Sequence, residues 1–137
     1  MKIIAYSSDE EIYKHRFLKD FQKYFQLEIE PDHNKIFKNN RTNPNIAVIA
    51  VIAAEDIKSR IVKYINNADE SNIGFIIHYS SCKSLGFLSK LGIKTNLFII
   101  NRDDESKILQ IAVNQLKQNI LKTKRIHLLR QNSISYK

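Results

Sequence analysis

The chain alternates between short apolar runs and longer segments with helical spacing, and this alternation most constrains its fold. Residues 46–54 and 73–79 are almost wholly apolar, and each run is about as long as a strand. Continuous apolar runs of this length are typical of parallel strands that are covered on both faces. Their alternation with helical segments predicts parallel strands joined by right-handed crossovers, and therefore an α/β domain.

About five strands and five helices are expected from this pattern. The strands are expected at 2–7, 27–29, 46–54, 73–79 and 96–100. The helices are expected at 8–25, 33–40, 55–66, 81–91 and 104–121. Gly92 is the expected C-cap of the fourth helix, and Tyr24, Leu88 and Ile108 are expected on inner helical faces.

Length and composition indicate one globular domain. The chain has 137 residues, of which 43% are hydrophobic, which is enough to bury a core. We expect a domain at 1–121 and a basic C-terminal extension or linker at 122–137. Cys82 is the only cysteine, so an internal disulfide is excluded. No apolar run is long enough to span a bilayer, so we expect a cytoplasmic protein that makes no membrane contact.

The positive charge is concentrated at the C-terminal end. Seven of the eight excess positive charges lie after Glu105, which is the last acidic residue. The residues of this basic tail that are candidates for binding a polyanion are Lys117, Lys122, Lys124, Arg125 and Arg130. Such a tail can attract nucleic acid or an acidic partner, and it can equally be the solvated end of a helix.

The order and spacing of these elements resemble the receiver domain of response regulators. Residues 60–65 through 74–80 resemble the third helix and fourth strand of a receiver, and 92–94 through 104 resemble its final glycine, fifth strand and acidic turn. The resemblance covers nearly the whole chain. It implies a (βα)5, flavodoxin-like three-layer sandwich with a central parallel five-stranded sheet.

The resemblance also implies where a phosphorylation pocket would lie, at the carboxyl ends of the strands. The matching positions are Ser7, Ser8, Asp9, Ala50, Ser80, Asn101 and Arg102. A receiver has an acidic pair, an acceptor aspartate and a lysine at these places, whereas this sequence has Ser7-Ser8, Ala50 and Asn101-Arg102. Magnesium requires oxygen ligands, and phosphoryl transfer relies on the metal. We therefore expect no metal, no cofactor, no catalytic residue and no enzyme activity.

A dimer or partner surface is implied near the last strand and helix. Lys90 and Lys94 lie on one part of it and Asp103 and Asp104 on another, so two copies can pair their charges across a two-fold axis. The leading hypothesis is a phosphorylation-independent regulatory domain, in signal transduction or transcription regulation, that forms homodimers or binds a regulatory protein. A DNA-binding effector domain outside this chain fits the same hypothesis.

Two other functions remain open at this point. The first is a stand-alone nucleic-acid-binding protein that uses the basic tail. The second is a small enzyme that pairs Cys82 as nucleophile with His78 as base, although nothing in the sequence orients the base. Binding of FMN is disfavoured because residues 7–11 contain no glycine and three acids.

Overall fold

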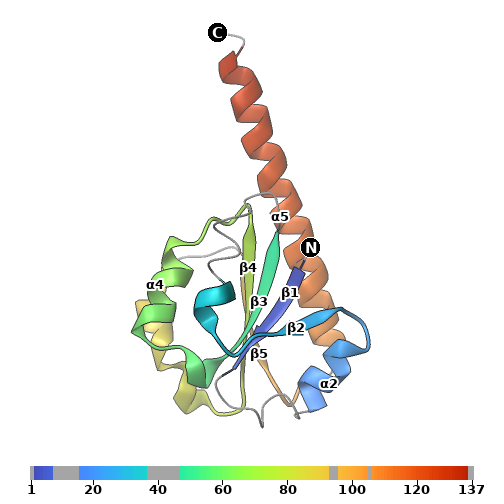
Figure 1. The fold of residues 1–137 in the computed structure, drawn as a ribbon, viewed down its shortest axis with the longest axis vertical. Coiled ribbons are helices and arrows are strands. Elements are labelled where there is room, and N and C mark those ends of the chain that lie inside the picture. The colour runs from blue at the N-terminus through green and yellow to red at the C-terminus, as the bar shows by residue number, and fades with distance from the viewer. Residues whose placement is uncertain (1, 8–15, 37–46, 93–95, 105, 136–137) are drawn as a thin grey trace.

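The structure is a computed structural model that describes residues 2–7, 16–36, 47–92, 96–104 and 106–135, with side-chain positions through Ile126 (Figure 1). Its centre is one sheet of five parallel strands in the order β2-β1-β3-β4-β5. The strands are β1 (Lys2–Tyr6), β2 (Leu27–Ile29), β3 (Val48–Ala53), β4 (Ile73–Tyr79) and β5 (Leu97–Asn101). This order confirms the predicted α/β, flavodoxin-like fold and leaves β2 and β5 at the sheet edges.

Both faces of the sheet are buried, which explains the unbroken apolar run of β3. Ile49 and Val51 pack on one face, and Ala50 and Ile52 pack on the other. All residues of β3 are buried, as a central strand between two helical layers requires.

Helices cover each face of the sheet (Figure 1). α2 (Arg16–Gln22) and α5 (Ser106–Ser135) pack on one face. The other face is covered by α4 (Ser59–Asn67) and by two 3-10 helices, η1 (Ala54–Asp56) and η2 (Cys82–Lys90). The inner side of α5 consists of buried apolar residues: Leu109, Ala112, Val113, Leu116 and Ile120.

The fourth helical segment is a 3-10 helix and not the predicted α-helix. Serine side chains bind carbonyl groups three residues earlier in its first and last turns: Ser84 Oγ donates to Ser81 O at 2.6 Å, and Ser89 Oγ to Gly86 O at 3.3 Å. Such bonds favour the tighter i to i+3 turn. Gly92 does not act as a left-handed cap, because no described glycine has a positive φ and its N–H donates instead to Asn66 Oδ1 at 2.8 Å.

Other helix boundaries and buried positions also differ between the prediction and the structure. The helix expected from residue 55 begins at Ser59, after the short turn of η1. Tyr24 and Leu88 are exposed, because α2 ends at Gln22 and η2 is not α-helical. Ile108 is also exposed, on the side of α5 that the sheet does not cover. These three inward assignments were therefore wrong.

The C-terminal helix is longer than the expected 104–121. α5 runs without a break to Ser135 and extends well past the end of the sheet (Figure 1). It therefore crosses the expected boundary between domain and extension at residue 121. Of the predicted helix at 33–40, residues 33–36 are helical and the remainder lies outside the described residues, as do residues 8–15. Within the described ranges, no helix has the length and apolar character needed to cross a membrane.

Gly74 gives a test of how tightly α5 is seated on the sheet. A Cβ atom at Gly74 in β4 would lie 3.1 Å from Leu116 Cδ2, whereas one at Gly86 would have no neighbour within 4 Å. Because overpacking a buried contact is unfavourable, we expect Gly74→Val to lower the free energy of unfolding by about 1–3 kcal/mol in urea denaturation. Gly86→Val is the matched control and should change it by no more than about 0.5 kcal/mol. Equal effects of the two substitutions on the free energy of unfolding would contradict close packing of α5 on β4.

Candidate functional site

Arg102 lies where the carboxyl ends of β3, β4 and β5 converge. It directly follows β5, and its backbone N–H donates to Tyr79 O at 2.8 Å, which continues the pairing of β4 with β5. The side chain is only 7% exposed. This edge of the sheet is where an open α/β fold forms its ligand crevice, so a buried charge here marks the candidate site.

The guanidinium of Arg102 joins the ends of three strands. Its Nε donates to His78 Nδ1 at 2.8 Å, and one terminal nitrogen donates to Ser80 Oγ at 3.4 Å. The other terminal nitrogen donates to His78 O at 3.3 Å and forms an ion pair with the carboxylate of Glu55. His78 and Ser80 belong to the end of β4, and Glu55 follows β3 in η1.

His78 is an acceptor in this network. It is 1% exposed, and its ring packs on Phe17 of α2 with 5.2 Å between centroids. Since Nδ1 accepts a hydrogen bond from Arg102, the bond requires the neutral imidazole with its proton on Nε2. The buried histidine therefore fixes the direction of the Arg102 side chain.

Glu55 supplies the opposite charge. Its side chain is 40% exposed while that of Arg102 is buried, so the ion pair lies between the buried strand ends and solvent. A guanidinium removed from water is costly unless its charge is paired and its donors are used. Glu55, His78 and Ser80 together meet that requirement.

The predicted pocket positions are only partly brought together. Ser80 and Arg102 are in contact, and Ser7 is buried at the end of β1. Asn101 turns to its own loop, where its Oδ1 accepts from Asp103 N at 2.9 Å. Ala50 lies in the interior of β3, which ends at Ala53. Ser8 and Asp9 lie outside the described residues.

Sequence reasoning did not foresee that Glu55 and His78 hold Arg102. A signal for His78 was present, because strand alternation places it on the same sheet face as the buried Ile76. A polar residue on a buried face requires a hydrogen-bond partner, and Arg102 provides it. Cys82, by contrast, is exposed at the start of η2. Since His78 Nδ1 is already engaged by Arg102, the proposed pairing of Cys82 with this base gains no support.

A second polar group lies at the end of β1. Burial raises the pKa of the Tyr6 phenol above its ordinary 10.0, and the negative charges of Asp56 and Asp32 raise it further. The ring of His33 stands edge-on to that of Tyr6, with 5.4 Å between centroids. Over the part of the chain that the structure describes, no three His, Cys, Asp or Glu side chains are grouped to hold a metal ion.

The predicted surface residues are accessible where they are described. Lys90, Asp103 and Asp104 are exposed, and Lys94 lies outside the described residues. In the basic tail, Lys122 and Arg125 are exposed and Lys124 is half-buried, while the side chain of Arg130 lies outside the described residues. Lys117 differs, because its Nζ lies 5.1 Å from the centroid of the Phe25 ring and packs the tail against the domain.

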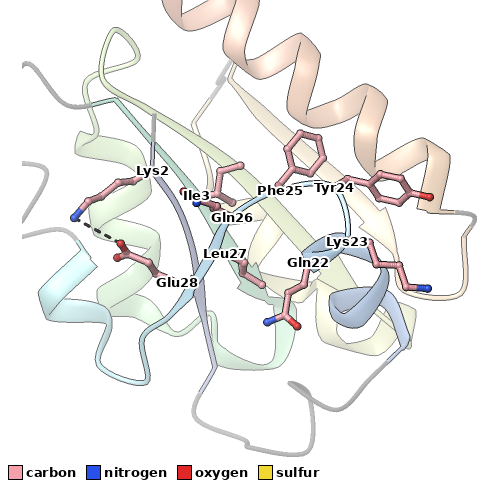
Figure 2. A pocket seen from close by; sticks show the side chains of 9 residues that line it. All are labelled: Lys2, Ile3, Gln22, Lys23, Tyr24, Phe25, Gln26, Leu27 and Glu28. Atoms are coloured by element: carbon pink, nitrogen blue, oxygen red, sulfur yellow. Dashed lines mark ion pairs between the residues drawn. The ribbon is translucent and has the colours of Figure 1, made fainter.

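An open hollow of about 630 Å³ lies at the far edge of the sheet, beside the starts of β1 and β2 (Figure 2). An exposed ion pair of Lys2 with Glu28, at 3.8 Å, spans two of its lining residues. The hollow lies at the amino ends of β1 and β2 (Figure 2), whereas Arg102 follows the carboxyl end of β5. Its lining charges are solvent-exposed, so we place the candidate site at Arg102 and not here.

Comparison with known proteins matches this chain to no family model, no curated protein and no solved structure. The functional argument therefore depends on the geometry around Arg102 and on the surface of the domain.

Replacing Arg102 tests whether its network holds the strand ends together. We expect Arg102→Met, which retains apolar bulk, to lower the free energy of unfolding by about 2–3 kcal/mol, because His78 Nδ1 loses its donor and Glu55 its partner. Chemical denaturation followed by circular dichroism measures the change. The control is Arg125→Met on the exposed part of α5, for which we expect a change within about 0.5 kcal/mol. If Arg102→Met had the same free energy of unfolding as the wild type, the network would not contribute to the stability of the fold.

Tyr6 gives a pH test of the end of β1. Since its pKa is raised on folding, the folded state keeps this proton more tightly than the unfolded state. The resulting stability is complete below pH 10 and is lost as pH rises through the folded pKa. In thermal melts between pH 8 and 11, Tyr6→Phe should therefore lose less stability above about pH 10 than the wild type. Tyr24→Phe, at an exposed position, should follow the wild-type curve.

Proposed function

We propose that this chain is a receiver-like regulatory domain that acts without aspartyl phosphorylation, through binding between protein surfaces. The observation that carries the proposal is the guanidinium of Arg102 at the carboxyl ends of β3, β4 and β5. In an open α/β sheet this is the place where a ligand or metal would be held.

The described residues around Arg102 lack the carboxylates that the chemistry of a phosphorylated receiver requires. Phosphoryl transfer to a carboxylate relies on a divalent ion that neutralises developing charge. Among the described residues, no group of three His, Cys, Asp or Glu side chains could hold such an ion. Glu55, the first acid after β3, forms an ion pair with Arg102, so its carboxylate is not free to bind a metal.

The network suits a scaffold whose output comes from its surface. It joins β3, β4 and β5 at one end, and α5 packs on the same three strands. Asp103 and Asp104 are exposed beside this end, whereas Lys90 is exposed toward the amino ends of the strands, where its carbonyl accepts a hydrogen bond from Asn66 at the end of α4. Exposed charges of opposite sign suit the docking of a regulatory protein or of a second copy. A role in signal transduction or transcription regulation follows from this proposal.

Phosphodonor treatment tests the proposal. The full chain is incubated with acetyl phosphate and Mg²⁺, and its mass is measured intact beside an active receiver treated in the same way. We expect no phosphoryl adduct on this chain, because the divalent ion has no site beside Arg102. The matched variant is Glu55→Gln, which removes the nearest carboxylate. A stable adduct on the wild type that is absent from Glu55→Gln would overturn phosphorylation-independent action.

A further inference from the structure

The outer side of α5 is unusually apolar for a solvent-facing surface. Seven large apolar side chains are exposed over the described part of the chain, and four of them lie on this helix. These four are Ile108, Ile111, Leu121 and Ile126, with 44%, 59%, 57% and 41% exposed. An apolar patch concentrated on one element marks a contact surface, whereas scattered apolar residues do not.

Three of these residues form a stripe along the helix, whereas Leu121 lies roughly 140° around the axis from Ile108 and is outside it. Ile108 and Ile126 are five helical turns apart and therefore lie on one line, with Ile111 beside the first of them. The positions between them on the same side are Gln115, Gln118 and Lys122. The stripe thus has an apolar group at each end and a polar middle.

Beyond Ile120, α5 projects past the end of the sheet, and of the side chains described there Leu121, Lys122, Arg125 and Ile126 are exposed (Figure 1). The last buried residue of the helix is Ile120, and the helix continues to Ser135, about 22 Å further at 1.5 Å per residue (Figure 1). A helix segment of about 15 residues is only marginally stable in water without packing. The distal half therefore favours a partner that covers its apolar side.

Charge decides how a second copy would lie. Between residues 106 and 135 the helix contains six basic residues and no acidic one. A parallel pair would bring Lys122 and Arg125 beside the same residues of the other copy, which is unfavourable. In an antiparallel pair with Ile126 opposite Ile108 and Ile111, Lys122 lies opposite residues 112–115 and Arg125 opposite residues 109–112, which are all uncharged, and the helix dipoles are opposed.

We propose that two copies of this chain pair through the outer sides of α5 in an antiparallel arrangement. Ile126 of one copy packs against Ile108 and Ile111 of the other, and the two-fold axis repeats the contact. The distal half of each helix then covers the domain-bound half of its partner. This inference rests on the surface-mediated action proposed above, and it specifies the partner as a second copy of the chain.

The oligomeric state is the first test. Sedimentation equilibrium of the full chain should give a dimer, and Ile111→Lys should raise its dissociation constant by at least about tenfold, because two such contacts are lost per dimer. Ile29→Lys is the matched control, since Ile29 is 42% exposed on β2, away from α5, and should leave the dimer unchanged. Circular dichroism checks that each variant is folded. A wild-type monomer, or a folded Ile111→Lys variant with unchanged dimerisation, would overturn the proposal.

Disulfide cross-linking tests the orientation. In a Cys82→Ser background, the double variant Ile111→Cys with Ile126→Cys should form a covalent dimer on mild oxidation, because the two positions face each other across the axis. Each single cysteine variant should remain uncross-linked. Efficient cross-linking of Ile111→Cys alone would indicate parallel helices and overturn the arrangement, as would dimerisation that requires added nucleic acid.

The two proposals can fail separately. A phosphoryl adduct would remove the phosphorylation-independent function and leave the antiparallel dimer standing. A strict monomer would remove the dimer and leave the argument from Arg102 unchanged.

Discussion

A buried positive charge organises one end of this domain. The guanidinium of Arg102 is removed from water, and it is stable there only because a carboxylate, an imidazole and a hydroxyl from two other strand ends meet its donors. The arrangement fixes a positive charge where β3, β4 and β5 end, and its hydrogen bonds and ion pair join these three ends to one side chain.

The network around Arg102 acts together with the two-layer core. β3 lies between β1 and β4 with buried apolar residues on both faces, so it contributes to both layers of the core. On one face, Gly74 allows Leu116 to approach the backbone of β4, so α5 sits close to the same strand that carries His78. The contact of Gly74 with Leu116 and the hydrogen bond of His78 to Arg102 thus lie at opposite ends of β4.

Local sequence patterns were sufficient to predict the strands of the sheet, but they were not sufficient to predict the details of the helices. The central strands β3 and β4 are continuous apolar runs, and burial on both faces leaves no other interpretation of them. In the 3-10 helix η2, serine side chains bind carbonyl groups three residues earlier, and helical periodicity in the sequence does not register such bonds. The site was partly foreseen at Ser80 and Arg102. Its other members, Glu55 and His78, come from separate strands, and only the tertiary arrangement brings them to one guanidinium.

The continuous geometry of α5 has a mechanical consequence. Its first half is clamped to the sheet and its second half is a straight continuation, so the element behaves as a lever arm with its fulcrum near Ile120. A tilt of about 10° at the clamp would carry the tip roughly 4 Å sideways, given a free arm of about 22 Å. A displacement too small to disturb the core is thereby magnified at a distance.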